Sequence, residues 1–317
     1  MTERDEPGFL EPEVDGFVED FVEYQPPEPY VQEIALFGGL ACDAHRTSDA
    51  AVVQVLRDGI ERVALASMGV ELTWWTSAIT PEDDLERGNS VTTVEGLDWS
   101  FVASRAGHLE GVTLLAEATA LRPYVGHPKR EPVVMHAGFP RPRPGSEPPV
   151  GQLRIGFSMH RWAMYGSGVD LARVVEPLTD WLLEGVDTLD ADTGYLTLDR
   201  VSARDGFSPW EEAVQTQNRQ VSAKLWGYGW GTLLSAAHVA VLGGIGPLQQ
   251  LDWATVQDRP GGRAWLTLTR DITAVGRHDM RLLRELLAPA LPIGSRNLQD
   301  YRDIIADPRF SSPDYLL

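Results

Sequence analysis

Segments with the two-residue period of a strand alternate along this chain with segments of helical period, which excludes an all-α and an all-β fold. The clearest strand pattern is at residues 153–160, where Leu153, Ile155, Phe157 and Met159 alternate with small or polar residues. A helical pattern follows over residues 169–184 and contains Pro177, which we expect to kink or divide the helix.

The first half of the chain shows the same order. We expect a strand from Ile34 to Phe37 closed by Gly38 and Gly39, a helix over residues 49–67, and a strand from Val70 to Ser77. Residues 80–110 are polar and show no regular period. The sequence therefore predicts an α+β fold of two strand–helix–strand halves with a mixed or antiparallel sheet, packed as one large globular unit.

Further elements are expected toward the C-terminus of each half. Residues 253–257 and 264–270 should pair through the turn Pro260-Gly261-Gly262, and an amphipathic helix should stop by Pro289. The remaining expected strands cover residues 112–120, 132–136 and 194–201.

A proline-rich stretch suggests an internal boundary, because proline at high density favours extended, solvated backbone. The predicted organisation is an acidic arm at residues 1–30, an N-terminal half at 31–139, a linker at 140–150, a C-terminal half at 151–292 and a tail at 293–317.

The chain has a net charge of −19 over 317 residues, which argues against nucleic-acid binding, since that normally requires clustered Lys and Arg. An acidic surface instead favours a basic protein partner. The plainer alternative is that the acidity only keeps the protein from aggregating.

The arm at residues 1–30 contains ten acidic residues and one basic residue, with aromatic residues threaded between them. This pattern suggests a docking segment in which carboxylates meet a basic groove and aromatics act as anchors; we select Phe17, Asp20, Phe21 and Tyr24. A solvated, disordered arm and an arm packed on the protein's own body remain alternatives.

The compartment is expected to be the cytoplasm. Cys42 is the single cysteine, so no intramolecular disulfide is possible, and the N-terminus shows no secretory signal pattern. No apolar run is long enough to span a membrane, so no membrane partner is expected.

The sequence shows no catalytic motif of the phosphate-loop, zinc-helix or nucleophile-elbow type. The acidic stretch at residues 187–194 fails the register of a calcium loop and is interpreted as a turn. We therefore expect no catalytic residue, no metal and no cofactor. An enzyme with an unrecognised site around His160, Asp170 and Asp192 stays open.

One block does resemble a known family. The segment from Lys224 to Gly244, with Trp230, Leu234 and a closing Leu242-Gly243-Gly244, is similar to the type VI immunity family (TsiV-like), and the resemblance covers about residues 150–292. In this block Ser235 should cap a helix and Gly243 should provide its left-handed end. The resemblance implies a cytoplasmic, non-catalytic antitoxin that occludes a toxin.

These observations favour an immunity-type protein that occludes a cationic protein partner, for which a nuclease toxin is one candidate. Its predicted interface adds Trp226, Tyr228 and Trp230 to the arm, although tryptophans beside glycines are more often core residues. The alternatives are an acidic nucleic-acid mimic or adaptor that occupies a basic groove, and an unrecognised hydrolase or transferase.

Overall fold

In the part of the chain that the structure describes, ten strands form a single sheet in which every pairing is antiparallel. The computed structural model describes residues 34–43, 48–66, 72–81, 89–105, 109–118, 133–138, 152–160, 171–200, 221–223, 225, 228–275 and 277–290. The α+β class and the packing as one unit are confirmed. The strands are β1 (Ile34–Asp43), β2 (Leu72–Pro81), β3 (Asn89–Glu95), β4 (Gly111–Ala118), β5 (Val133–Gly138), β6 (Gln152–His160), β7 (Thr193–Arg200), β8 (Gly231–Leu234), β9 (Thr255–Arg259) and β10 (Arg263–Thr267).

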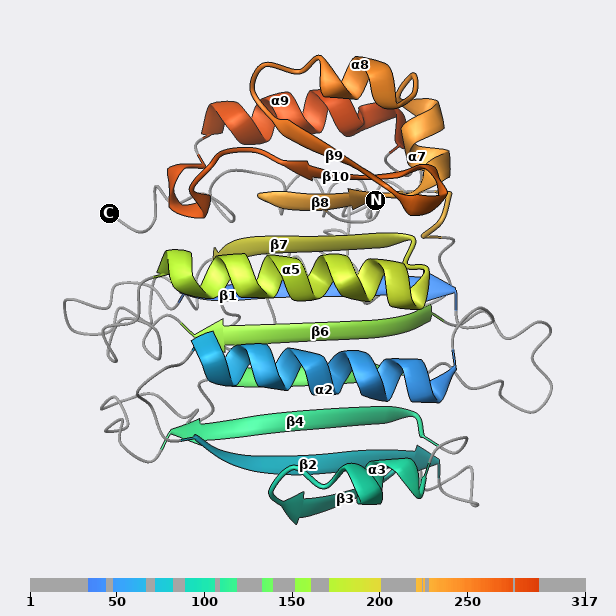
Figure 1. Cartoon of the computed structure of the whole chain (residues 1–317), viewed down its shortest axis with the longest axis vertical. Coiled ribbons are helices and arrows are strands. Elements are labelled where there is room, and N and C mark those ends of the chain that lie inside the picture. The colour runs from blue at the N-terminus through green and yellow to red at the C-terminus, as the bar shows by residue number, and fades with distance from the viewer. Residues whose placement is uncertain are drawn as a thin grey trace, which may run out of the picture.

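The strand order is β3-β2-β4-β5-β6-β1-β7-β8-β10-β9 (Figure 1). The first described strand, β1, therefore lies between β6 and β7, both from the later half. Ala35 to Asp43 pair with residues 152–160 on one side, and β7 supplies the pairing on the other. The two predicted halves thus share one continuous sheet.

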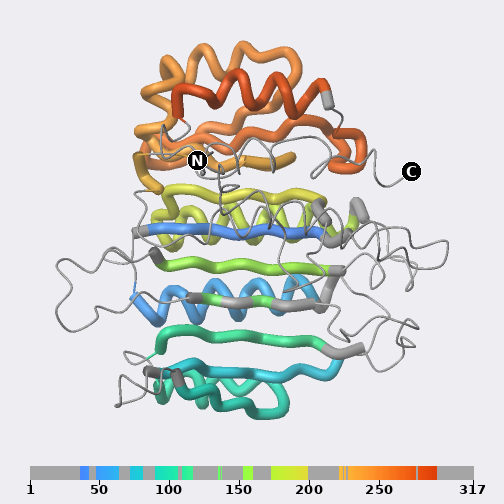
Figure 2. Tube along the Cα trace, turned by 180° about the vertical axis from the view of Figure 1, so that it is seen from behind, coloured from blue at the N-terminus to red at the C-terminus, as the bar shows by residue number. Residues whose placement is uncertain are grey.

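The two long helices lie side by side on one face of this sheet, and Figure 2 shows the strands from the other face. In α5, Trp181 donates from Nε1 to the carbonyl of Val55 in α2 at 2.8 Å, and its ring meets that of Phe157 with centroids 5.4 Å apart. The described helices are α2 (Asp49–Ala66), α3 (Trp99–Ala103), α5 (Leu171–Leu189), α7 (Ala236–Val241), α8 (Ile245–Gln249) and α9 (Arg277–Leu287).

Helix α5 is one helix of 19 residues that continues through Pro177. Of the two expected effects of this proline, a kink or a division of the helix, the division is wrong. An internal proline costs a helix about 3 kcal/mol. The apolar side of α5 offsets this cost, because Leu178, Trp181 and Leu182 are each fully buried against the sheet and α2, and one such side chain contributes about 1.5–3 kcal/mol.

Gly38 and Gly39 do not end the first strand; β1 runs through both. They are needed for close approach rather than for a turn. A Cβ atom on Gly38 would lie 2.4 Å from Cε1 of Phe157, and one on Gly39 would lie 2.8 Å from the carbonyl oxygen of Ile155. The glycine pair in the sequence was therefore misinterpreted as a strand end.

Residues 80–110, expected to be irregular, contain β3 and α3. Asp98 caps α3 by accepting a hydrogen bond from the backbone N–H of Phe101 at 2.8 Å. Strand β3 escaped the sequence pattern because it lies at the end of the sheet and most of its residues are exposed, so it needs no alternating apolar face.

The C-terminal elements follow the sequence closely. Strands β9 and β10 pair through the turn at Pro260, and α9 ends at Leu287, as expected. The same agreement holds in the first half of the chain, where α2 forms from Asp49 to Ala66 within the helix expected over residues 49–67. Local patterns thus placed these elements correctly, while the order of strands in the sheet depends on contacts between distant segments.

Candidate functional site

Two of the residues predicted to touch a partner lie in the protein core. Tyr228 and Trp230 are 3% and 7% exposed, and Trp230 donates from Nε1 to the carbonyl of Thr269 at 2.9 Å. Their position agrees with the usual core role of aromatics beside glycine. The other predicted residues, Phe17, Asp20, Phe21, Tyr24 and Trp226, lie outside the described part of the chain, and their partner contacts stay predictions.

The block that carried the family resemblance forms β8 and α7. Ser235 caps α7: its Oγ accepts from the backbone N–H of His238 at 3.2 Å, and its own N–H donates to Nδ1 of His238 at 3.1 Å. Gly243 follows the helix with a φ of 92°, in the left-handed region. Both roles expected from the sequence are confirmed, and both stabilise structure rather than perform chemistry.

The alternative enzymatic site is only partly described. Asp192 is 5% exposed, in the turn before β7, whereas Asp170 and the side chain of His160 lie outside the described residues. Among the described side chains, no group of three or more His, Cys, Asp or Glu is arranged to hold a metal ion.

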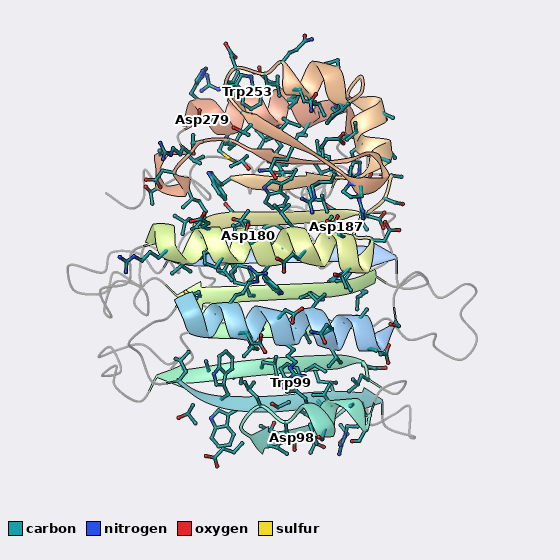
Figure 3. The ribbon with its side chains drawn as sticks, viewed as in Figure 1. Asp98, Trp99, Asp180, Asp187, Trp253 and Asp279 are labelled. Atoms are coloured by element: carbon teal, nitrogen blue, oxygen red, sulfur yellow. The ribbon has the colours of Figure 1, made fainter. Side chains whose placement is uncertain are left out.

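Helix α5 carries a row of exposed carboxylates: Glu176, Asp180, Glu184 and Asp187. Figure 3 labels Asp180 and Asp187 on this helix. Because the four carboxylates are spaced by three or four residues, they share one exposed side of the helix. The only basic residue in α5 is Arg173. We call these four residues the α5 acidic row.

Two members of the row are paired with arginines from neighbouring elements. Glu184 accepts from Nη2 of Arg62 in α2, and Asp187 accepts from Nη2 of Arg259 in β9. These ion pairs connect α5 to the elements on both sides of it. Glu184 and Asp187 therefore help to hold α5 against its neighbouring elements.

The other two members, Glu176 and Asp180, are exposed and have no ion pair within the described residues. They stand four positions apart, and like charges at this spacing destabilise a helix by about 0.2–0.5 kcal/mol. Both carboxylates can therefore accept hydrogen bonds from Lys or Arg without breaking an ion pair to another described residue.

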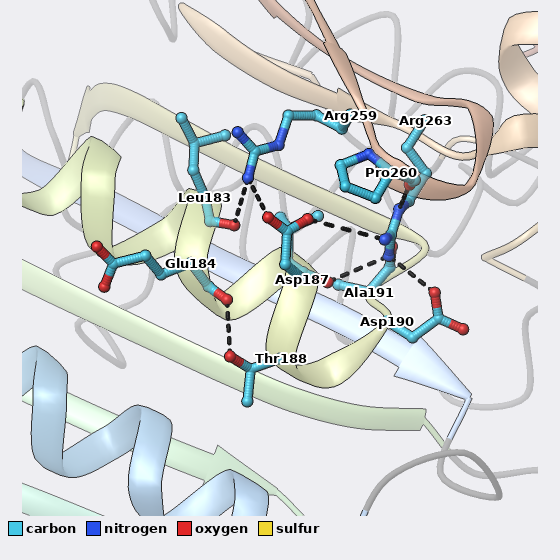
Figure 4. Close-up of polar contacts among 10 residues, drawn as sticks. Leu183, Glu184, Asp187, Thr188, Asp190, Ala191, Arg259, Pro260 and Arg263 are labelled. Atoms are coloured by element: carbon cyan, nitrogen blue, oxygen red, sulfur yellow. Dashed lines mark hydrogen bonds and ion pairs between the residues drawn. The ribbon is translucent and has the colours of Figure 1, made fainter.

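The C-terminal end of α5 is held by Arg263, which is nearly buried (Figure 4). Its Nη1 donates to Oδ1 of Asp190 at 2.9 Å and to the carbonyl of Val186 at 3.1 Å, while Nε donates to the carbonyl of Pro260 at 2.8 Å. The residues at 187–194 expected to form a turn thus bind arginine.

The opposite face of the sheet holds a second arginine, Arg154, which is partly buried. Gly39 of β1 pairs with Gly156 of β6 on one side and with Tyr195 of β7 on the other, so these residues share one face of the sheet. Arg154 stands two residues before Gly156 in β6 and therefore lies on the same face as Tyr195. Burial lowers the pKa of the Arg154 guanidinium to about 10, a shift that the nearby Tyr195 partly opposes. Arg154 is still cationic at neutral pH.

In the sequence, the α5 acidic row is a set of acids three or four residues apart, and the arm at residues 1–30 has a higher density of acids. Four such acids on the solvent side of an amphipathic helix are common in soluble proteins, so spacing alone did not single them out. Only the structure shows that two are paired and two are not.

No helix in the described part of the chain is long and apolar enough to cross a membrane. No protein-family model matches the sequence, and no curated protein matches it. Among solved structures, the chain is similar to the Pseudomonas aeruginosa T6SS protein PA0821, with a TM-score of 0.55 and 14% identity over 89% of this chain and 84% of that one. At this identity the likeness establishes a shared fold.

Proposed function

We propose that this chain is an immunity-type binding protein of a type VI system, which binds a cationic protein in the cytoplasm and blocks that protein's active groove without catalysis. The observation that carries the proposal is the likeness of fold, across nearly the whole chain, to a T6SS protein. The immunity role is supported further by the block around Trp230 that resembles type VI immunity proteins.

The charge of the chain supports a cationic partner. The net charge is −19, and Glu176 and Asp180 present carboxylates that form no ion pair within the described residues. Opposite charge raises the rate of encounter between proteins and is screened by salt. A nuclease toxin fits this chemistry, because a groove that holds nucleic acid is basic.

The partner can be captured on immobilised full-length protein at low and at high salt. We expect one stoichiometric basic protein at low salt and its loss at high salt. Expressed alone, the captured protein should arrest growth, and co-expression of this chain should restore it. A captured protein that does not impair growth would contradict the immunity role while leaving a binding role intact.

Two variants locate the interface. Deletion of residues 1–30 tests the arm, and Glu176→Gln with Asp180→Asn tests the α5 acidic row. The matched control is Asp258→Asn with Glu285→Gln, which removes the same charge from exposed positions in β9 and α9. Weaker capture by a test variant than by the control places the interface; equal capture by all variants excludes both regions.

A further inference from the structure

The two ends of the sheet are formed by strands of very different character. Strand β9 lies at one end and β3 at the other (Figure 1). An edge strand presents unpaired backbone N–H and C=O groups, which can pair with another chain. Natural proteins usually protect such edges with charges, prolines, bulges or covering elements.

Strand β9 carries several of these protections. It contains Asp258 and Arg259, is followed directly by Pro260, and lies against α8. The side chain of Arg259 is engaged with Asp187 of α5. A further strand added to this edge would meet charges and a proline, so this end of the sheet is closed to pairing.

Within the described part of the chain, strand β3 carries fewer of these protections, and its one charged side chain, Glu95, stands at its end. Its sequence, Asn-Ser-Val-Thr-Thr-Val-Glu, has no lysine or proline, and it pairs with β2 one residue to one from Asn89 to Glu95, without a bulge. Within the described part of the chain, β2 is its sole neighbour in the sheet. Val91 is 61% exposed, the most exposed large apolar side chain among the described residues.

The sequence of β3 is complementary to itself when two copies run antiparallel. Centred on Thr92, such a pair places Val91 opposite Thr93 and Asn89 opposite Glu95. Pairs of β-branched residues are favourable across strands. Odd-numbered residues of one copy lie opposite odd-numbered residues of the other, and even-numbered residues lie opposite even-numbered ones. The same face of both sheets therefore points the same way, and the helices of the two copies would lie on the same side of the joined sheet.

The charge of the strand also permits this pairing. Glu95 is the one charged residue of β3 and stands at its end. In the antiparallel pair the two Glu95 side chains are at opposite ends, about 20 Å apart at about 3.4 Å per residue. That distance exceeds the screening length of about 8 Å at physiological salt.

We propose that β3 pairs with β3 of a second copy of this chain, forming an antiparallel dimer with one continuous sheet. This assembly is independent of the proposed immunity function. It would cover the edge of β3 that has no neighbouring strand within the described residues, and the exposed side chain of Val91. The interface is a single strand from each copy, so the dimer should be weak and dependent on concentration.

The test is the molar mass of the intact chain in solution at increasing concentration, by light scattering after size exclusion. We expect the wild type to approach twice the 35.0 kDa of one chain. Val91→Lys should raise the dissociation constant about tenfold or more, since two like charges would lie diagonally across the pair. Val241→Lys is the matched control, because Val241 is 53% exposed on α7, away from this edge.

A second experiment detects direct contact between the two strands. Val91→Lys and Val91→Glu should each be monomeric, and an equimolar mixture should recover the dimer. A wild type that stays at 35.0 kDa overturns the proposal, as does a dimer that Val91→Lys leaves intact. If the wild type is a monomer and Val91→Lys instead abolishes binding of another protein, the edge serves a different partner and the dimer is wrong.

Discussion

Nη1 of Arg263 donates a hydrogen bond to Oδ1 of Asp190 at 2.9 Å, so the first residue of β10 is tied to the residue that follows α5. Asp190 has a φ of 51°, in the left-handed region, and is the only non-glycine residue with positive φ among those described. The contact therefore holds a tight turn in place while joining two parts of the chain far apart in sequence.

Replacement of Arg263 by Met should destabilise the fold by about 2–3 kcal/mol, because the carboxylates and carbonyls that it binds lose a buried charged donor. Urea unfolding followed by circular dichroism measures the change. The control is Arg57→Met, whose ion pair with Glu61 is exposed and 3.9 Å long, and which should cost under about 0.5 kcal/mol. Equal losses in the two variants would contradict the anchoring role of Arg263.

Gly38→Ala should destabilise the protein by about 1–3 kcal/mol, because the added methyl overlaps the ring of Phe157. Phe157→Leu should lower this penalty when the two changes are combined, and a double-mutant cycle measures the coupling. The control is Gly246→Ala in α8, where a Cβ meets no atom within 4 Å. That change should be neutral or stabilising by up to about 1 kcal/mol.

Ser235→Ala should cost about 1–2 kcal/mol, because the side chain caps α7 and also donates to the carbonyl of Ser222 at 2.7 Å. Thermal and urea unfolding test this value. Ser100→Ala is the comparison, since Ser100 is exposed in the first turn of α3 and is not the cap. A cost below that of the comparison would show that the cap contributes nothing measurable.

Glu176→Gln with Asp180→Asn should raise the stability of the protein slightly, by about 0.2–0.5 kcal/mol, because it removes repulsion between like charges on α5. High salt should reduce the gain by screening that repulsion in the wild type. Thermal unfolding at two ionic strengths measures both effects. A loss of stability would mean that one of the two carboxylates takes part in a favourable contact.

The stability contributed by Arg154 should rise as the pH increases above about 10. Its pKa in the folded protein lies below the ordinary value of an arginine in the unfolded chain. Between these values the unfolded chain binds more protons than the folded one, so stability increases with pH. The free energy of unfolding of the wild type should therefore increase relative to that of Arg154→Met as the pH rises through this range. A difference in unfolding free energy that stays constant with pH would show that the pKa of Arg154 is not shifted.

Sequence patterns placed the long amphipathic helices and the β9–β10 hairpin, because those elements depend on local periodicity and turn residues. They failed where tertiary contacts decide. Glycine is required at positions 38 and 39 because Phe157 and Ile155 approach the backbone there too closely for a Cβ atom. These two residues belong to a strand more than a hundred positions away in the chain. The position of β1 between β6 and β7 is likewise fixed by nonlocal pairing.

The candidate site shows the same division. Carboxylates at i and i+4 on α5 can be read from the sequence, but the pairing of Glu184 and Asp187 with Arg62 and Arg259 cannot, since those arginines come from other elements. The burial of Tyr228 and Trp230 was foreseen only as an alternative, because an aromatic residue in a glycine-rich segment fits either a core or an interface.

The place of β1 in the sheet constrains the order in which a ribosome-bound chain can mature. Both neighbours of β1 come from residues 152–200, so this strand leaves the ribosome on the order of ten seconds before either can pair with it, at typical rates of synthesis. Until then the nascent first half has a strand with no place in its own sheet. Completion of the fold must therefore wait for the second half, and the chain is exposed to aggregation or chaperone capture in the interval.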